Sequence, residues 1–275
     1  MNDSVRVFVP GHVTGFFTVE RDDDPTRAGS TGAGVALADG VTVTVRPAEE
    51  TTVTLNGESA SMEAVERVLR ALSVRAAVSG ETPLPIGSGF GVSGAMALGA
   101  ALGANDLFQT KLSENELVTI AHGAEVQAGT GLGDVVAQAR GGIPIRLEPG
   151  GPHYGKLDGI PARGRIEYVS FGELDTGAVI GGDTDELTSA GEEALSRVVQ
   201  KPTIEQFMYA SRWFARETGL VTDDVTTAIT AVNDVDGEAS MAMLGNTVFA
   251  LGTGLSDAGY EPTVTEIHPG GPSLL

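Results

Sequence analysis

The chain has 275 residues, of which 41% are hydrophobic, so it is long and apolar enough to bury a full core. Its 37 acidic and 17 basic residues leave a formal net charge of −20, which argues against nucleic-acid binding and against docking on an anionic membrane surface. No apolar run approaches the roughly 18 residues of a membrane span, and residues 1–20 lack the pattern of a signal peptide, so we expect a cytoplasmic protein with no membrane partner.

The sequence contains no cysteine, which excludes disulfides, thiolate zinc sites and a cysteine nucleophile. Any catalytic metal must therefore bind through oxygen or imidazole. Lysine occurs only at positions 111, 156 and 201, and all other basic residues are arginine. Few lysines among many carboxylates suggest a halophilic protein from a cytosol of very high salt, where the Debye length is about 3 Å or less. An ordinary acidic enzyme is the alternative.

Hydrophobic patterning predicts a mixture of strands and helices in the first half of the chain. Ser61 is the expected N-cap of a helix with an apolar stripe, and Ser113 with Glu116 has the pattern of a capping box. The predicted elements are strands over residues 5–9, 41–45, 52–55 and 143–147 and helices over residues 62–78 and 113–127. We expect Pro10-Gly11 to end the first strand and residues 29–35 to form a turn.

A Pro- and Gly-rich passage over residues 148–164 precedes a change of rhythm and is a candidate domain boundary. The elements expected beyond it are a strand over residues 166–171, helices over 184–199, 203–218 and 224–233, and a hairpin of 240–244 with 247–251. The fold class predicted from this layout is α+β.

Residues 85–95 form a glycine-rich loop that runs into an apolar helix expected from Met96 onward. Such a loop presents unpaired N–H groups and the positive end of a helix dipole, which suits a phosphate. A Walker A motif is excluded because no lysine lies between residues 1 and 110. A dinucleotide fingerprint and a nucleophile elbow both lack the strand that must precede them. A loose turn before a core helix is the remaining alternative.

A second glycine-rich segment, residues 121–142, carries two carboxylates, Glu125 and Asp134. Mg²⁺ takes one or two carboxylate or hydroxyl oxygens, which Ser93 and Glu125 can supply around a nucleotide. Asp134 can then take the proton from an acceptor hydroxyl during phosphoryl transfer. A solvated helix face for Glu125 and a helix N-cap for Asp134 are the purely structural alternatives.

These motifs together resemble the GHMP kinase superfamily, which includes galactokinase, homoserine kinase and mevalonate kinase. The 85–95 loop is similar to the central motif of that family, with Ser93 kept and with Phe90, Val92 and Gly94 in place of its leucine, first serine and alanine. The resemblance implies a two-lobed α+β GHMP kinase fold. Its N-terminal lobe, ribosomal-protein-S5-like α/β, would span residues 1–150, and its ferredoxin-like α+β C-terminal lobe would span residues 151–275.

The resemblance also implies ATP and Mg²⁺ as cofactors. By resemblance, Ser93 and Glu125 hold Mg²⁺ and Asp134 is the catalytic base. The residues that it assigns to the ATP phosphates are Pro85, Gly87, Ser88, Gly89, Phe90, Gly91, Val92, Ser93 and Gly94. Residues 243–249 resemble a reduced form of the third family motif, and its role is left open.

Within the superfamily, the segments 10–17 and 29–35 and the reduced third motif are most similar to the archaeal pantoate kinase branch. This branch implies ATP-dependent phosphorylation of pantoate to 4-phosphopantoate in coenzyme A synthesis. The expected partners are therefore pantoate and ATP, without nucleic acid, and a homodimer is one assembly that the sequence leaves open.

Pantoate carries a carboxylate, which arginine is best suited to grip through two hydrogen bonds. Arg146, on the strand after the second glycine-rich segment, is the expected partner, and Arg27 is a weaker candidate. His122 precedes Glu125 by one helical turn and shares its face, so it is expected near the acceptor unless it is a core histidine. Ser30 and His12 are expected to be loop donors to the substrate.

Two other functions stay open at this point. One is phosphorylation of another small alcohol such as homoserine, shikimate or mevalonate. The other is a non-catalytic nucleotide-binding regulator, against which the joint presence of Ser93, Glu125 and Asp134 speaks, because a regulator has no need of a base.

Overall fold

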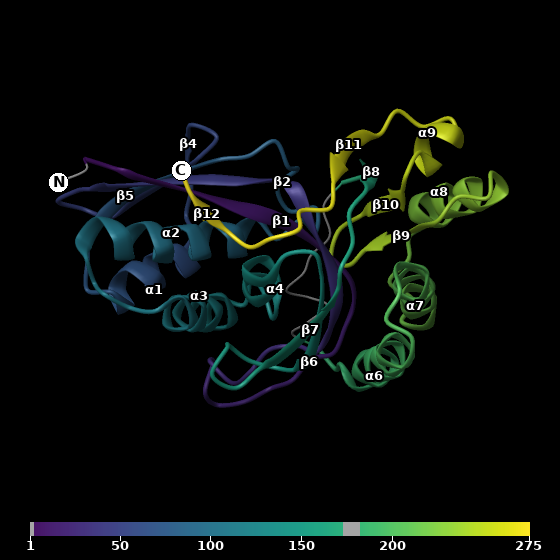
Figure 1. Cartoon of the computed structure of the whole chain (residues 1–275), viewed down its shortest axis with the longest axis horizontal. Coiled ribbons are helices and arrows are strands. Elements are labelled where there is room, and N and C mark those ends of the chain that lie inside the picture. The colour runs from purple at the N-terminus through teal and green to yellow at the C-terminus, as the bar shows by residue number, and fades with distance from the viewer. Residues whose placement is uncertain (1–2, 173–181) are drawn as a thin grey trace.

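The computed structural model describes residues 3–172 and 182–275, and within them the strands form two sheets. Eight strands of the described chain make the larger sheet, in the order β12-β1-β2-β5-β3-β4, with β6 pairing β2 and β7 pairing β6. The four-stranded sheet has the order β11-β8-β10-β9. The α+β class predicted from the sequence is therefore confirmed, with the two sheets at opposite ends of the molecule (Figure 1).

The larger sheet carries its helices on one side (Figure 1). Its strands are β1 (Val5–Phe17), β2 (Gly32–Pro47), β3 (Thr52–Leu55), β4 (Glu58–Ser59), β5 (Ala76–Glu81), β6 (Ile143–Glu148), β7 (Lys156–Ile160) and β12 (Ser273–Leu274). The helices are α1 (Glu63–Ala71), α2 (Val92–Phe108), α3 (Glu114–Ala128) and α4 (Asp134–Arg140). Helix α2 is buried along most of its length and contacts both β1 and β2, so the core lies between this helix and the sheet.

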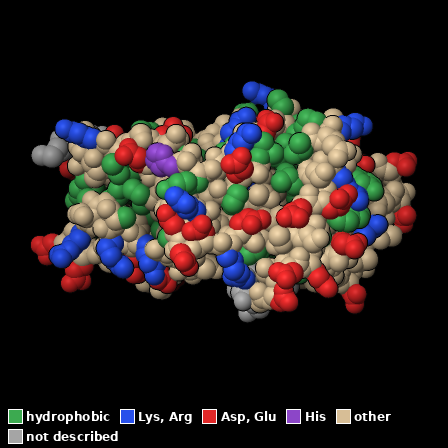
Figure 2. Space-filling view, turned by 90° about the horizontal axis from the view of Figure 1, so that it is seen from below, with side chains coloured by type: hydrophobic (Ala, Val, Ile, Leu, Met, Phe, Trp, Pro, Cys, Tyr) green, Lys and Arg blue, Asp and Glu red, His purple; other side chains and the backbone are tan. Residues whose placement is uncertain are grey.

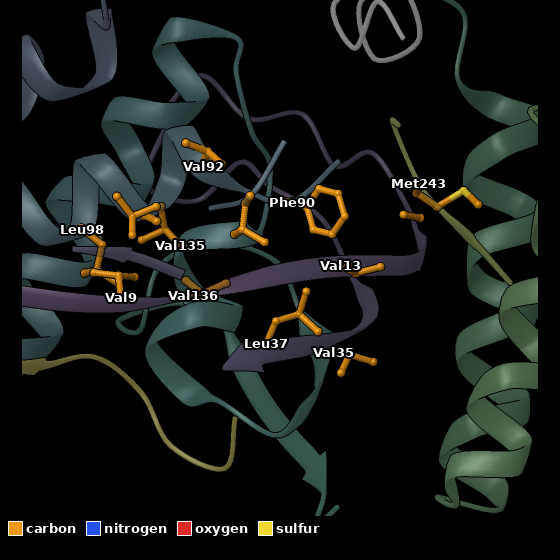
Figure 3. Close-up of a cluster of buried hydrophobic side chains, with 14 of the residues drawn as sticks. Val9, Val13, Val35, Leu37, Phe90, Val92, Leu98, Val135, Val136 and Met243 are labelled. Atoms are coloured by element: carbon orange, nitrogen blue, oxygen red, sulfur yellow. The ribbon is translucent and has the colours of Figure 1, made fainter. Parts of the chain in front are cut away.

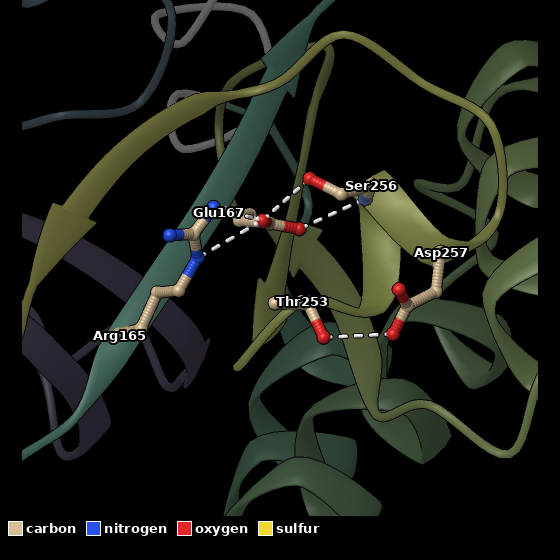
Figure 4. A network of polar contacts seen from close by, with 5 residues as sticks. All are labelled: Arg165, Glu167, Thr253, Ser256 and Asp257. Carbon is tan, nitrogen blue, oxygen red and sulfur yellow. Dashed lines mark hydrogen bonds and ion pairs between the residues drawn. The ribbon is translucent and has the colours of Figure 1, made fainter.

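The smaller sheet consists of β8 (Arg165–Ser170), β9 (Ala239–Ala242), β10 (Thr247–Leu251) and β11 (Thr263–Glu266). Its helices are α6 (Asp185–Gln200), α7 (Ile204–Glu217), α8 (Asp223–Asp234) and α9 (Gly254–Asp257). Glu167 of β8 is fully buried, where it accepts hydrogen bonds from Arg165 and from both the backbone N–H and the hydroxyl of Ser256 (Figure 4). This charged network fixes α9 onto the sheet.

Strand β1 links the two ends of the molecule. It pairs β2 along its whole length. Its second half also packs on α6 and α7, where the Phe16 ring lies 6.3 Å from the ring of Phe207. The chain also returns to β1 at its end, because β12 pairs with residues 7 and 8 (Figure 1).

Most predicted elements are confirmed within about two residues. The capping box is present, with the Ser113 hydroxyl accepting from the Glu116 backbone and the Glu116 carboxylate accepting from Ser113. Gly219 follows α7 with a φ of 65°, as a C-terminal glycine does. The hairpin β9-β10 and the helices α6, α7 and α8 also lie where the pattern predicts them.

Four local predictions were wrong. Pro10-Gly11 does not end the first strand, because a register shift between these residues absorbs the irregularity and β1 continues to Phe17. Residues 32–35 are strand rather than turn. The helix expected over 62–78 ends at Ala71, with Ser73 at a φ of 57° after it, and its N-cap is Met62 instead of Ser61. The helix expected from Met96 begins at Val92, four residues earlier.

The change from one sheet to the other comes between Ile160 and Arg165. The division predicted after residue 150 falls between β6 and β7, which pair with each other in the larger sheet. The extent of the two lobes stays a prediction.

Acidic side chains are spread over the face of the molecule that Figure 2 shows. Figure 2 shows one face, on which Asp and Glu side chains occur along the whole length and Lys and Arg side chains lie among them. In the described part of the chain, no helix combines the length and apolar character that crossing a membrane requires.

Candidate active site

The glycine-rich loop 85–91 enters α2 through glycine conformations that other residues rarely adopt. Gly87, Gly89 and Gly91 have φ angles of 73°, 84° and 66°, and Gly91 is the N-cap of α2. No side chain in the described part of the chain caps this helix end, and the first residues of α2 line the pocket beside the loop. Backbone donors and the positive end of the helix dipole therefore converge there.

The loop packs against two neighbouring parts of the chain, Tyr168 and the β9-β10 turn. Phe90 is 1% exposed and its ring points into the core, 4.6 Å from the ring of Tyr168 (Figure 3). The β9-β10 turn, residues 243–246, packs against the loop so closely that a Cβ on Gly245 would lie 2.0 Å from the carbonyl oxygen of Ser88. The Thr247 hydroxyl donates to the same oxygen at 3.1 Å. Tyr168, the β9-β10 turn and Thr247 all belong to the smaller sheet, so this sheet supports the loop.

Glu125 lies at the floor of this pocket with two hydroxyl donors. The hydroxyl of Ser93 donates to Glu125 Oε1 at 2.6 Å, and that of Thr130 donates to the same oxygen at 2.9 Å. Burial raises the pKa of Glu125 to about 7, against the effect of these hydrogen bonds. The side chain is thus a buried carboxyl group, and the solvated helix face is excluded as an alternative.

Asp134 is the first residue of α4 and is held by His12 of β1. His12 Nδ1 lies 2.7 Å from Asp134 Oδ1, and because a carboxylate only accepts, Nδ1 is the donor. Burial alone would raise the pKa of Asp134, but the hydrogen bond from His12 and the charge of Arg146 act against burial, and the pKa is lowered. Asp134 is therefore ionised at neutral pH. Its alternative role as an N-cap is excluded, because Gly133 holds that position.

Arg146 of β6 is a buried cation near this carboxylate. It is 2% exposed, its Nε donates to the Ser30 carbonyl at 3.4 Å, and its Nη1 has no hydrogen-bond partner among the described residues. Burial lowers its pKa to about 10, so it stays charged at neutral pH. A small hollow connects Arg146 with Asp134, and it is lined also by Thr14, Phe17, Ser30, residues 131–133 and Leu244.

Thr14, Asp134 and Leu244 line both this hollow and the larger pocket at the glycine loop. The predicted base therefore stands at the junction of two cavities. One has backbone donors for phosphate, and the other has a buried cation.

The other predicted residues are distributed unevenly. All predicted loop residues except Pro85 and Ser88 line the larger pocket, and Ser88 is buried at 3% exposure. Ser30 lines the small hollow. His122 is 1% exposed, and its Nε2 lies 2.8 Å from the Ala28 carbonyl, so it has the contacts of a satisfied core histidine. His12 lies in a strand and not, as expected, in a loop.

Arg27, the weaker candidate for the carboxylate, lies outside both cavities. Its guanidinium stacks over the Tyr154 ring at 4.6 Å and is exposed. Among the residues that the structure describes, no three His, Cys, Asp or Glu side chains cluster as a metal site would require. A metal ion bound here must therefore take some of its ligands from a bound molecule or from water.

Sequence reasoning assigned no role to Thr14, Thr130 or Leu244, although Thr14 and Leu244 lie in the segments 10–17 and 243–249 that it singled out. Thr14 follows His12 by two residues and so projects from the same side of β1. This spacing would have indicated Thr14 if residues 10–17 had been predicted as strand. Leu244 has a φ of 64°, which the Gly245-Asn246 hairpin pattern did not predict.

Comparison with known proteins places this geometry in a family. Residues 60–142, which contain the glycine loop, Glu125 and Asp134, match the model of the GHMP kinase N-terminal domain. A pantoate kinase of Methanospirillum hungatei is 34% identical over 98% of this chain and 96% of its own length. One of Methanocaldococcus jannaschii is 33% identical over 89% of this chain and 92% of its own.

The chain belongs to the pantoate kinase family of GHMP kinases.

Solved structures agree with this membership of the GHMP kinases. A structure described as a phosphotransferase related to the CoA biosynthesis pathway matches 99% of this chain and 98% of its own, at 30% identity and a TM-score of 0.87. A homoserine kinase from Cytophaga hutchinsonii is 18% identical with a TM-score of 0.67, which shows a shared fold. The predicted GHMP kinase fold is thereby confirmed, and the chain is a kinase.

Proposed function

We propose that this kinase transfers the γ-phosphoryl group of ATP to the primary hydroxyl of pantoate, giving 4-phosphopantoate for coenzyme A synthesis. The observation that carries the proposal is the buried, charged Arg146, whose Nη1 has no described partner and which shares a hollow with Asp134. A buried guanidinium nitrogen without a hydrogen-bond partner is costly, and a substrate carboxylate would remove that cost. The pantoate kinases to which the chain is similar supply the identity of the acceptor.

We assign the ATP phosphates to the loop 87–94. The free N–H groups at the start of α2 and the left-handed glycines offer several donors to one anion without any lysine. Leu55, Met62 and Ile86 line the same pocket and give an apolar surface that suits a base.

Ser93 and Glu125 would hold Mg²⁺. A hydroxyl and a carboxylate are the hard oxygen ligands that this ion takes, and their oxygens already lie 2.6 Å apart. The raised pKa of Glu125 fits the same role, because a cation beside the buried carboxylate would offset its burial. When bound, Mg²⁺ neutralises charge on the transferring phosphate.

Asp134 is the proposed general base. Because Oδ1 accepts the hydrogen bond from His12, Oδ2 is the oxygen left to take the proton of the acceptor hydroxyl. The hydroxyl oxygen of the acceptor forms the new bond to phosphorus as it loses this proton. The proton passes to Asp134 and the phosphoryl group leaves ADP. The junction of the two cavities at Asp134 supports this arrangement, because the hydroxyl and the phosphate must meet there.

The residues that line the hollow also suit the chemistry of the rest of pantoate. Phe17, Leu132 and Leu244 supply an apolar wall for the two methyl groups that pantoate carries between its ends. Homoserine has an ammonium group, which the charge of Arg146 would repel. Ser30 is the proposed hydroxyl partner, whereas the contact of His122 with Ala28 supports an indirect role in shaping the 28–30 backbone.

The proposal also covers the location of the enzyme, its salt requirement, the extent of its lobes and its assembly. The negative charge and scarcity of lysine support a cytoplasmic enzyme working at high salt. The lobes over residues 1–150 and 151–275, and a homodimer, are proposed from the family resemblance alone.

The proposed function is tested by measuring ADP release with Mg-ATP in molar KCl against pantoate, homoserine, mevalonate and shikimate, with the product identified by mass spectrometry and phosphorus NMR. We expect turnover with pantoate and a phosphate on its primary hydroxyl. Turnover with another acceptor alone would contradict the proposal.

Asp134→Asn tests the base, since it keeps the size of the side chain and removes its basicity. We expect kcat to fall by about 10²- to 10⁴-fold while the KM for ATP changes little. An unchanged kcat would show that the proton leaves by another route.

A further inference from the structure

We propose that His12 is a positioning residue for Asp134 and for the glycine loop, and that it does not bind the substrate as the sequence suggested. The inference rests on the proposed role of Asp134 as base. It assigns to the histidine of the opening Pro10-Gly11-His12 segment the task of holding one carboxylate oxygen so that the other stays available to the acceptor.

His12 makes two contacts that converge on the reaction site. Its Nδ1 donates to Asp134 Oδ1 at 2.7 Å, and its backbone N–H donates to the carbonyl oxygen of Phe90 at 3.0 Å. A single residue of β1 therefore fixes both the proposed base and the end of the loop that precedes α2. A shift of either group relative to the other would require His12 to move.

The backbone around His12 explains why its side chain reaches Asp134. The register of β1 with β2 shifts between Pro10 and Gly11, where the partner changes from Gly40 to Leu37. Irregularities of this kind re-aim side chains beside active sites. After the shift, the His12 ring packs against Gly34, at which a Cβ would lie 2.2 Å from His12 Nε2. The ring is thus held in one orientation.

Burial separates His12 from any substrate. The residue is 0% exposed, and it lines neither the pocket at the glycine loop nor the hollow at Arg146. Asp134, whose side chain is 24% exposed, lines both. The substrate can therefore touch the carboxylate while the imidazole acts from behind it.

The ring is a neutral donor. Its Nε2 is buried with no hydrogen-bond partner among the described residues, so a proton there would be left unsatisfied. Burial lowers the pKa of His12, and the charge of Arg146 lowers it further, whereas Asp134 acts in the opposite direction. The charged groups near Asp134 are Arg146 from β6 and Glu125 from α3, and His12 from β1 acts on it through the hydrogen bond. A neutral donor orients the carboxylate without cancelling its charge.

The test compares His12→Asn with His12→Leu, two side chains of similar size. Asparagine keeps an N–H donor near the place of Nδ1, and leucine removes it. We expect the leucine variant to lose about 10²-fold in kcat, with the KM values for pantoate and ATP changing by less than about threefold, and the asparagine variant to regain most of the loss. His153→Leu, at an exposed histidine, is the control and should keep wild-type kcat.

Equal losses of kcat in the two His12 variants would overturn the positioning role, provided that the two variants have similar unfolding temperatures. A rise in the KM for pantoate at constant kcat would also overturn it and would return His12 to the substrate site. If wild-type enzyme does not phosphorylate pantoate, the proposed function fails instead, and the next measurement still decides the state of His12.

Nitrogen NMR of ¹⁵N-histidine-labelled wild-type protein provides this second readout, which needs no turnover. The sequence has 4 histidines, so the His12 signals can be assigned by their loss in His12→Asn. We expect the neutral tautomer with the proton on Nδ1, unchanged between about pH 6 and about pH 8. The tautomer with the proton on Nε2, or a cationic ring at neutral pH, would contradict the proposal.

Discussion

Glu125 and Asp134 line one pocket, but their surroundings shift their pKa values in opposite directions. Burial dominates at Glu125 and raises its pKa to about 7, with the charge of Asp134 acting in the same direction. At Asp134 the hydrogen bond from His12 and the charge of Arg146 oppose burial, and the pKa is lowered. Two carboxylates of the same chemistry are thereby prepared for different roles, one as a ligand and one as a base.

Mg²⁺ binding is expected to depend on pH through Glu125. The metal needs the carboxylate, so below pH of about 7 binding must expel a proton, and the affinity should fall by up to about tenfold per pH unit. Calorimetric Mg²⁺ titrations in the presence of a nucleotide, at about pH 6 and about pH 8, check this. Equal affinities at both pH values would exclude Glu125 as a ligand.

The same shift affects stability without metal. Because the folded pKa of Glu125 lies above its ordinary value of 4.5, its contribution to the free energy of unfolding decreases as pH rises from 4.5 to about 7. Glu125→Gln should therefore be more stable than wild type at about pH 8 without Mg²⁺, and this variant serves as the control for the titration.

Arg146 is expected to act on the acceptor and not on ATP. Arg146→Met keeps much of the side-chain volume but removes the charge, so we expect the KM for pantoate to rise by about 10- to 100-fold with little change in the KM for ATP. Initial-rate kinetics with each substrate varied separately measure the two constants. Parallel rises in both would mean that Arg146 maintains the fold of the site as a whole. Its burial at 2% exposure makes an accompanying measurement of the unfolding temperature necessary.

At the scale of elements, the site depends on β1 and on the β9-β10 turn, which both hold the glycine loop. Strand β1 reaches the loop through the backbone N–H of His12 and reaches the turn through the Thr14 carbonyl, which accepts from the Met243 N–H at 2.9 Å. Gly245 of this turn contacts the loop at Ser88 and Gly89. The reduced third motif therefore has a supporting position beneath the loop, whatever contacts it makes with a nucleotide.

Gly245→Ala tests this support. A Cβ at Gly245 would meet the Ser88 carbonyl at 2.0 Å, and because that atom is backbone, the loop or the turn must move. We expect the KM for ATP to rise by about tenfold, since a displacement near 1 Å has large effects on a positioned site. Steady-state kinetics and nucleotide titration check the expectation.

Gly270→Ala is the matched control for that variant, because a Cβ at Gly270 would have no atom of the described residues within 4 Å. Its kinetic constants should equal those of wild type. If Gly245→Ala behaves like this control, the turn does not constrain the loop.

For the whole molecule, the dominant feature is the net charge of −20. Salt screens repulsion among exposed charges, so we expect the unfolding temperature to rise by several degrees between about 0.1 M and about 2 M KCl. Circular dichroism against temperature at a series of KCl concentrations measures the effect. An unfolding temperature that stays constant or falls with salt would favour the ordinary acidic enzyme over the halophilic one.

Much of the fold could be predicted from the sequence, because helices α3, α6, α7 and α8 are marked by caps and apolar periodicity that act over a few residues. The errors lie where a distant partner decides the backbone. Residues 10–17 and 32–35 contain glycines that would end an isolated strand, but β1 and β2 pair with each other and keep both extended. Helix α1 stops at Ala71 because residues 76–81 pair with β2 and β3.

By itself, the sequence determined the chemistry that is present: a glycine loop before a helix, a serine, two carboxylates and an arginine, in an order that predicts a kinase. Only the tertiary structure decided which of them meet. Glu125 lies beside Ser93 because α3 packs on α2, and Asp134 faces His12 across 122 residues of sequence. The sequence assigned His12 to the substrate, whereas in the structure it is buried behind the carboxylate. Sequence spacing sets local conformation, but long-range packing sets burial, and burial determines which polar groups a substrate can reach.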